Sequence, residues 1–470
     1  MVKRGTRRRF LRSGAAAGIL TLAGCGSTND GDSTPTGASA TGEPAGNDGA
    51  ESATESMTEP SQASGPRPTL PAEYVVWKGE DEVVAMDGRS LERVRAGAAG
   101  AEDGAVLQHA LAAMRGGGRL FVKNATYTVD RQLNVLHPHT EIVSDSARLR
   151  FGDHELYGDP NVEEQVDLNL RADFARLSGL VVDGNKAERS TATRTVNVSS
   201  AANVTIQDCV IRGGRSENGN RGYGIGPYHT NHLVVENCLI ADNDRHGIHP
   251  GSSEGPFADV RISNCTFLRN ASDPSGAAVD IRDHTRSALV VGNYFEGNGN
   301  GVRVKGENVG TLRVADNVLV GNRTGTDSSG QVQVWVDDAE EVAITDNTFV
   351  LEEGGEGVTH VELTPAGPVG TATVTGNRFA GGGGAVFASG DIRWLVVEDN
   401  GFAGATAECF AADEATYALV TGNRFDQADA DGDTAVLLER IDHGLVTDNV
   451  VVDAGIETDD TVERARNRRW

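Results

Sequence analysis

The chain is poor in aromatic residues, in positive charge and in long apolar runs. Aromatics make up 5% of its 470 residues and hydrophobic residues 38%. No apolar run reaches 18 residues, so no membrane-spanning helix is expected. The sequence has 42 Lys and Arg and 68 Asp and Glu, which gives a formal charge of −26 and disfavours nucleic acid as a partner. With so few aromatics, the 59 glycines favour many short strands joined by turns over a large α/β enzyme.

Residues 1–24 have the layout of an export signal. Six basic residues and no acidic one accompany an Ala/Gly-rich apolar stretch from Gly14 to Ala23. The segment from Thr6 to Arg12 resembles a twin-arginine motif, and Leu22 to Cys25 resembles a lipobox. This resemblance implies export of the folded chain and a lipidated Cys25 that anchors it outside the cytoplasm. A plain secretory signal with a chance cysteine is the alternative.

Residues 25–70 are predicted to form a disordered tether. They consist mainly of Ser, Thr, Gly, Ala, Pro, Asp and Glu without any aromatic residue, and therefore bury too little surface to fold. The remaining residues, 71–470, keep a charge of 35 − 61 = −26. Acidic residues spread evenly in this way are typical of adaptation to high salt. Divalent-cation binding is the alternative, with calcium the open cofactor and no site located.

An eight-residue pattern recurs ten times between residues 204 and 451. Its first and third positions are apolar, its fifth is a turn residue, its sixth is Cys or Asn, and its eighth is apolar or aromatic. The sixth position falls on Cys209, Cys238, Cys265, Asn293, Asn317, Asn347, Asn377, Asn400, Asn423 and Asn449. Alternation with a period of two indicates strands, and repeat steps of 23 to 30 residues indicate one solenoid coil per copy.

These repeats predict an all-β fold, a right-handed parallel β-helix, with the Asn residues stacked as an inward ladder. The Leu-dominated signature of leucine-rich repeats is absent, and propeller blades need about 40 residues, more than the repeat step of 23 to 30 residues. Residues 102–114 have one apolar helical face and predict an N-terminal helical cap. This helix and the "GG-apolar-strand" segment after it resemble the start of pectate-lyase-superfamily proteins. We expect the cap and first coils over 71–175, further coils over 176–455, and a polar tail over 456–470.

The cysteines leave two structures open. Cys209, Cys238 and Cys265 occupy the same position in successive coils, within disulfide reach of one another. Stacked, buried thiols that act as small hydrophobic groups are the favoured interpretation. No CxxC pair is present, so no metal site is predicted from these residues.

A second short strand follows most ladder positions and presents polar residues on the outer surface. Aligning the apolar positions of these strands gives two outward files, one with Gly224, Gly247, Asp280, Arg303, Trp335 and His360, the other with Gly226, His249, Arg282, Lys305, Asp337 and Glu362. Such a mixture suits a sugar polymer, because aromatic rings pack on pyranose faces and Arg or Lys bind carboxylates. A solvated face with cross-coil ion pairs such as Asp280 with Arg303 is the alternative.

Two partial family resemblances fall on this surface. The segments from Tyr223 to His229 and from Arg245 to Ile248 resemble a pattern of mannuronan C5-epimerases, with Gly226 where that pattern has Asp. The segment from Arg245 to Ser252, together with that from Gly301 to Lys305, resembles polygalacturonase motifs without their acid pair.

These observations predict a lipid-anchored β-helix protein that acts on acidic polysaccharide as a lyase or epimerase. The candidate catalytic residues are His246, Tyr223, Asp280 and Arg303; the candidate substrate-binding residues are His249, Arg282, Lys305, Trp335, Asp337 and His360. In this chemistry His246 or His249 is the base, Tyr223 the acid, and a cationic side chain neutralises the uronate. The alternative is a non-catalytic carbohydrate-binding or surface-structural protein. The four methionines disfavour copper-enzyme maturation.

The lipobox generates the first prediction. Cys25→Ser removes the thiol that would carry the lipid, so the protein should leave the membrane fraction and appear in the medium. Fractionation and immunoblotting measure this, and unchanged membrane association would contradict the assignment.

Overall fold

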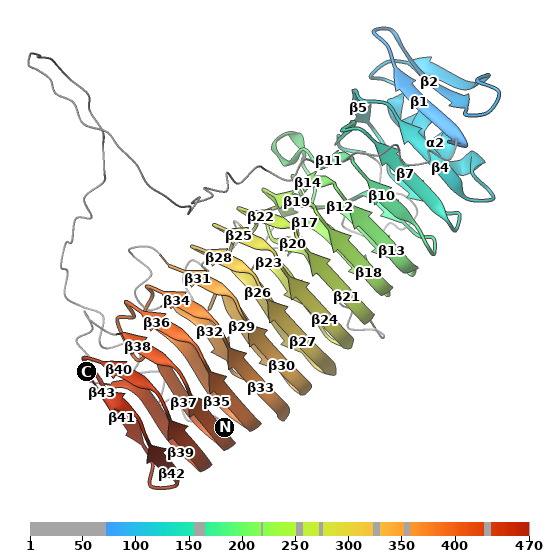
Figure 1. Ribbon diagram of the computed structural model, residues 1–470. Helices are drawn as coiled ribbons and strands as arrows, with labels where there is room; N and C mark the ends of the chain where they lie inside the picture. The colour runs from blue at the N-terminus through green and yellow to red at the C-terminus, as the bar shows by residue number, and fades with distance from the viewer. Residues whose placement is uncertain are drawn as a thin grey trace, which may run out of the picture. The chain divides into compact units, whose positions relative to one another are not determined.

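The computed structural model describes residues 72–154, 165–217, 220–250, 257–271, 276–322, 330–351, 358–426 and 434–469. The predicted signal and tether lie outside these residues. Figure 1 shows short strands of successive coils lying parallel to one another over most of this part of the chain. The fold is a right-handed parallel β-helix with an N-terminal helix, as predicted.

Each coil contributes one strand to each of three parallel sheets. One coil contains β12 (Thr193–Ser199), β13 (Ala202–Gln207) and β14 (Val210–Arg212), and these pair in register with β17 (Tyr223–Tyr228), β18 (Asn231–Glu236) and β19 (Leu239–Ala241) of the next coil. Because the pairing is parallel and in register, each residue lies one strand spacing, about 4.8 Å, from its counterpart.

The first sheet contains β9 (Gln165–Leu170), β12 and β17. It continues with β20 (His246–Ile248), β23 (Ala277–Ile281), β26 (Asn300–Gly306), β29 (Val332–Val336) and β32 (Thr359–Leu363). The second sheet contains β13, β18, β21 (Phe257–Ser263), β24 (Thr285–Val291), β27 (Val309–Ala315), β30 (Ala339–Thr345) and β33 (Val369–Thr375). The last long strands, β35 (Gly384–Glu398), β37 (Phe410–Thr421) and β39 (Thr434–Thr447), run through both sheets. The third sheet has 14 strands, from β5 (Thr126–Val129) to β43 (Arg468–Arg469).

The N-terminal end of the coil interior is covered by α2 (Asp103–Ala113). Its apolar face buries Val106, Leu107 and Leu111, as the helical spacing predicts. The antiparallel strands β1 (Tyr74–Lys78), β2 (Glu82–Asp87) and β3 (Arg93–Ala98) precede it, and β4 (Gly118–Val122) joins β1 to β7 (Thr140–Ser144). No helix in the described part of the chain has the length and apolarity of a membrane span.

The C-terminal residues differ from the predicted polar tail. β41 (Gly455–Thr458), β42 (Val462–Ala465) and β43 continue the three sheets by pairing with β39 and β40 (Val450–Val452). Only Ile456 and Val462 pack inward, and this weak apolar signal explains why the repeat pattern misses the coil.

The predicted asparagine ladder is present and extends one residue further, to Asn467. From Asn293 onward, each side-chain amide donates to the Oδ1 of the next rung at 2.9–3.0 Å. The cysteine rungs are free thiols whose Sγ atoms donate to nearby backbone carbonyls, and the ladder passes from Cys265 N to Asn293 Oδ1 at 2.8 Å. The stacked-thiol interpretation is therefore confirmed.

A second ladder lies at another corner and was not predicted. It runs through Asn243, Asn270, Asn298, Asn322 and Gln331 to His360. Its members lie outside the eight-residue pattern, which accounts for the omission. Both ladders satisfy backbone groups that the coil corners leave unpaired inside the molecule.

Removing one rung should therefore destabilise the fold. Asn377 bonds to Asn347, Asn400 and the carbonyl of Ile344, so Asn377→Ala leaves several buried groups without partners and should cost about 2–3 kcal/mol. Urea unfolding measures this. Thr373→Ala, at a half-buried position of the same coil, is the control and should stay within about 0.5 kcal/mol; equal effects would contradict the role of the ladder.

Candidate functional site

The first sheet keeps the predicted register between β17 and β20 and between β23 and β26, but departs from it by two residues between β20 and β23 and between β26 and β29, and by four between β29 and β32. Ile248 pairs with Val279, and Val302 pairs with Val332, whereas the apolar alignment matched His246 to Val279 and Val302 to Val334. The reason is that several strands begin with two adjacent buried residues, such as Ala278 and Val279, which breaks the simple in–out alternation. The true outward file consists of Asn134, Asn169, Asn197, Gly226, His249, Asp280, Arg303, Gln333 and Glu362.

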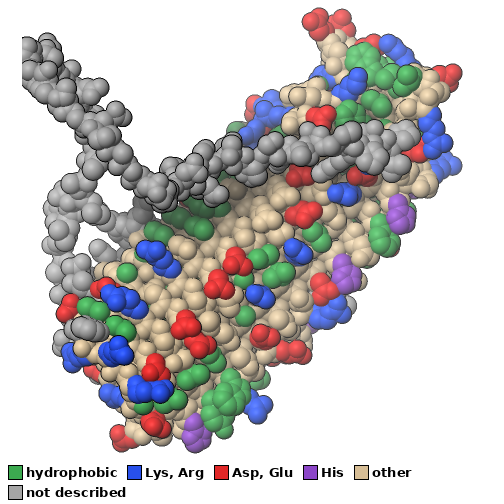
Figure 2. All heavy atoms as spheres, in the orientation of Figure 1, with side chains coloured by type: hydrophobic (Ala, Val, Ile, Leu, Met, Phe, Trp, Pro, Cys, Tyr) green, Lys and Arg blue, Asp and Glu red, His purple; other side chains and the backbone are tan. Residues whose placement is uncertain are grey.

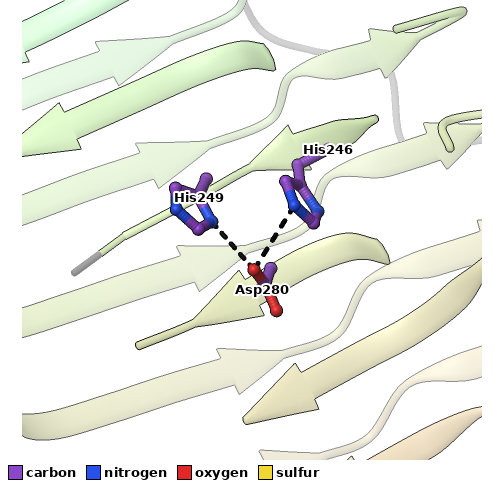
Figure 3. Close-up of side chains that lie close together, drawn as sticks. All are labelled: His246, His249 and Asp280. Carbon is purple, nitrogen blue, oxygen red and sulfur yellow. Dashed lines mark hydrogen bonds and ion pairs between the residues drawn. The ribbon is translucent and has the colours of Figure 1, made fainter. Parts of the chain in front are cut away.

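Asp280, on β23, lies at the centre of a charged cluster (Figure 3). Its Oδ2 accepts from His249 Nδ1 at 2.8 Å and from Arg282 Nε at 2.7 Å, and its Oδ1 accepts from Arg303 Nε at 2.5 Å. The predicted ion pair between Asp280 and Arg303 is thus confirmed. Asp280 is fully buried, and about one fifth of the His249 and Arg282 side chains is exposed, at 21% and 22%.

His246 lies beneath this cluster and is fully buried. Its Nδ1 accepts the backbone N–H of Ala277 at 3.0 Å, so the proton of the neutral ring is on Nε2. That atom lies 3.4 Å from Asp280 Oδ2 and makes no hydrogen bond to any described residue. His246 therefore packs against the buried side of the Asp280 carboxylate and does not reach solvent.

The ring of Tyr223 packs against both histidines. Its centroid lies 4.6 Å from that of His249 and 5.2 Å from that of His246, and the two histidine rings are stacked at 4.8 Å. Arg194 lies over the other side of Tyr223, with Cζ 5.7 Å from the ring, and donates to Asn197 Oδ1 at 3.1 Å.

Gly226 explains the departure from the epimerase pattern. A Cβ at this position would meet Arg194 Cδ at 2.8 Å, so the arginine fills the space that a side chain would need.

The remaining predicted residues lie apart from the Asp280 cluster. Lys305 lies over the Trp335 ring, 5.7 Å from its centroid, and Asp337 is exposed after the end of β29. The outward prediction for His360 is wrong: it is fully buried and its ring nitrogens contact Gln331 Nε2 at 3.0 Å and the Gly381 carbonyl at 2.9 Å. It continues the second ladder because His360 and Val361 are adjacent buried residues near the start of β32, which breaks the in–out alternation there.

The cluster holds neutral histidines beside an ionised carboxylate. Burial lowers the pKa of His246 well below its ordinary value, and burial also lowers the pKa of His249 although Asp280 opposes this. Burial raises the pKa of Asp280, but its contacts with His246, Arg303 and His249 outweigh burial and hold that pKa well below its usual range. At neutral pH, His249 Nδ1 must carry the proton that Asp280 accepts, which leaves Nε2 as a free base.

His246, His249 and Asp280 also bring three metal-ligating atoms within 4.8 Å of one another. Two histidines and a carboxylate are a familiar ligand set. Here, however, two guanidinium groups already bond to the carboxylate, and a divalent cation would have to enter beside these positive charges. The charge distribution favours an anion over a cation at this place.

Sequence reasoning missed Arg194, Asn197, Asn169 and Gln333. Asn197 donates to Asn169 Oδ1 at 3.0 Å, and Gln333 donates to Glu362 Oε2 at 3.0 Å, which extends the polar file in both directions. The alternation Thr193-Arg194-Thr195-Val196-Asn197 carried the signal, but it precedes the first recognised repeat.

Comparison with known proteins agrees with the fold. A family model described as "Right handed beta helix region" matches residues 174–319. No curated protein sequence matches the chain.

Similar solved structures include the A-module of mannuronan C-5 epimerase AlgE4 from Azotobacter vinelandii, with 14% identity over 78% of this chain and 96% of that chain and a TM-score of 0.47. The tailspike protein of E. coli bacteriophage HK620, in complex with a pentasaccharide, has 11% identity over 77% and 74% and a TM-score of 0.44. An exopolygalacturonase from Thermotoga maritima has 14% identity over 66% and 86% and a TM-score of 0.37. At these identities the likeness concerns the fold alone.

Buried neutral histidines make stability depend on pH. Burial lowers the pKa of His360 to about 4, whereas an unfolded histidine titrates near 6.5. Between these values the unfolded chain binds more protons, so His360 should cost about 2 kcal/mol of stability as the pH falls from 7 to 5. His360→Gln should lose less stability over this interval in urea unfolding. The exposed His109→Gln is the control and should follow the wild type; identical slopes for both variants would contradict the argument.

Proposed function

We propose that the surface around His249 and Arg282 binds an acidic polysaccharide and removes the proton next to a uronate carboxylate. Lyases and epimerases share this step and differ in the fate of the carbanion that it produces. The observation that carries the proposal is the dyad of Asp280 and His249, which places a neutral, partly exposed imidazole beside cationic groups.

Local charge favours an anionic ligand. Around His249, the guanidinium groups of Arg194, Arg282 and Arg303 accompany the carboxylate of Asp280, a balance of 3 − 1 = +2 in a chain whose formal charge is −26. A positive region on an otherwise acidic surface attracts polyanions and orients them. Arg282, partly exposed and fixed by Asp280, is placed to receive the uronate carboxylate.

His249 is a better base than His246, because His246 is fully buried and its Nδ1 is occupied by Ala277. His249 Nε2 takes the proton from the carbon next to the carboxylate, and Asp280 stabilises the imidazolium that forms. The electron pair left on carbon is delocalised into the carboxylate, whose charge Arg282 offsets.

That intermediate has two possible outcomes. In elimination, the bond to the glycosidic oxygen breaks and Tyr223 supplies the proton that the leaving oxygen needs. In epimerisation, a proton returns to the same carbon from the opposite face, and the chain stays intact. Tyr223 is the candidate acid for the elimination, because its ring lies against that of His249 and both approach the sugar from the same side.

Glycan binding without catalysis is the second candidate function. The observation in its favour is the burial of the cluster: His246 and Asp280 are fully buried and Arg303 is 7% exposed, as in a structural ion-pair network. On this view, the exposed parts of Arg282, Lys305 and Trp335 only hold the polymer.

We also propose that the protein is exported and anchored through Cys25, so that this surface meets polymers outside the cytoplasm. The support is the sequence of the first 25 residues.

The catalytic proposal is tested with uronate polymers, reading unsaturated product by absorbance and deuterium uptake at carbon by NMR. His249→Gln should lower turnover at least about 100-fold with binding changed only a few-fold, since a base acts mainly in the transition state. Arg282→Ala should weaken binding about 10- to 150-fold, because it removes a charge-assisted contact.

Arg286→Ala is the matched control, since it removes an exposed arginine from the second sheet. It should leave binding and turnover unchanged. Activity that survives in His249→Gln would contradict the proposed base, and binding by the wild type without turnover on any polymer would favour the second candidate.

A further inference from the structure

The second sheet carries an exposed aromatic stack far along the chain from the Asp280 cluster. Trp394, Tyr417 and His443 are in-register neighbours on β35, β37 and β39. The rings of Trp394 and Tyr417 are stacked at 4.2 Å and 14°, and those of Tyr417 and His443 at 5.3 Å and 24°. Figure 2 shows hydrophobic side chains with a histidine beside them over these C-terminal strands.

Trp394 remains 45% exposed although Tyr417 covers one of its faces. The opposite face points toward the preceding coil, where the same file carries the small side chain of Thr371. Glu341, which is exposed, occupies the position one coil further away. Two strand spacings separate Glu341 from Trp394, about 9.6 Å, with only a threonine between them. The space above Thr371, between the Trp394 ring and Glu341, is therefore about the thickness of one ring, and we call this space the seat.

The surroundings of this seat suit a sugar. Val396 and Leu419 lie half-buried beside Trp394 and Tyr417 and extend the apolar surface of the stack. Beside the stack in sequence, an open hollow of about 270 Å³ is lined by Gly390, Asp391, Ile392, Glu414, Ala415, Thr416, Arg440 and Asp442. Aromatic faces pack on the C–H faces of pyranoses, while carboxylates accept hydrogen bonds from hydroxyl groups.

The local charge separates this place from the first-sheet site. Arg440 is bonded to Asp413 and Glu414, so its charge is already matched. The charged residues that line the hollow are Arg440, Asp391, Glu414 and Asp442, a balance of 1 − 3 = −2. A polyuronate would be repelled here, whereas a neutral sugar meets acceptors for its hydroxyl groups.

We propose that Trp394, supported by Tyr417 and His443, is a binding site for a neutral pyranose, which sits on its free face above Thr371 with Glu341 as a hydrogen-bond acceptor. This site is separate from the proposed uronate site and would hold a neutral stretch of glycan while the first sheet acts on an acidic one.

The test measures binding of cellohexaose, maltohexaose and mannohexaose to the full chain by calorimetry and saturation-transfer NMR. At least one of these should bind, and Trp394→Ala should weaken it at least tenfold, while Trp394→Phe should retain most of the affinity. Thr371→Phe is the decisive variant: it fills the seat and extends the aromatic stack, so binding should be lost without any fall in melting temperature.

Two controls isolate this site. Trp335→Ala removes the other half-buried tryptophan of the coils, and His249→Gln disables the proposed base; both should bind the neutral probe as the wild type does. Conversely, Trp394→Ala should leave the activity on uronate polymers unchanged, so failure of one proposal is distinguishable from failure of the other.

Three results would overturn the proposal: no binding of any neutral probe at millimolar concentration, wild-type binding by Thr371→Phe, or a dimer in sedimentation that Trp394→Ala dissociates. The last result would assign the stack to contact with a second copy of the chain.

Discussion

In-register parallel pairing between coils is the constraint on which the rest of the structure depends. Once Ile248 is paired with Val279 and Val302 with Val332, every outward residue has fixed neighbours one strand spacing away. Side chains distant in sequence therefore meet in files, and the ladders of Asn side chains hold the corners that set this register. The Asp280 cluster and the Trp394 stack are two results of the same rule.

The same rule makes a buried charge tolerable. Asp280 has no solvent contact, and an isolated carboxylate there would be protonated. Its neighbours come from three consecutive coils: His249 before it, Arg282 on its own, and Arg303 after it. Removing any one of them leaves the carboxylate partly unpaired, so geometry and charge in this cluster are coupled.

The sequence predicts the fold well because one rule repeats ten times, with Asn or Cys at each coil corner. It predicts the site only in part. His246, His249, Asp280 and Arg303 do come together, and the pairing of Asp280 with Arg303 was predicted. The contact of His249 with Asp280 depends on a register between β20 and β23 that the apolar pattern places two residues away. Adjacent buried pairs such as Ala278 and Val279 cause this error, and His360 with Val361 is another such pair, which puts His360 in the interior. The partners Arg194 and Asn197 precede the first clear repeat.

The exposed strand edges of the last described coil bear on whether two solenoids can stack end to end. Within the described residues no further strand covers β41, β42 and β43, so their outer edges present backbone groups that invite the end of another solenoid. Strand β43 consists of Arg468 and Arg469, both exposed, and β42 exposes Glu463 and Arg464. Charged side chains along such an edge discourage end-to-end polymerisation, while α2 blocks the opposite end. Within the described residues, the exposed charges of β42 and β43 thus disfavour the stacking of another solenoid on this edge.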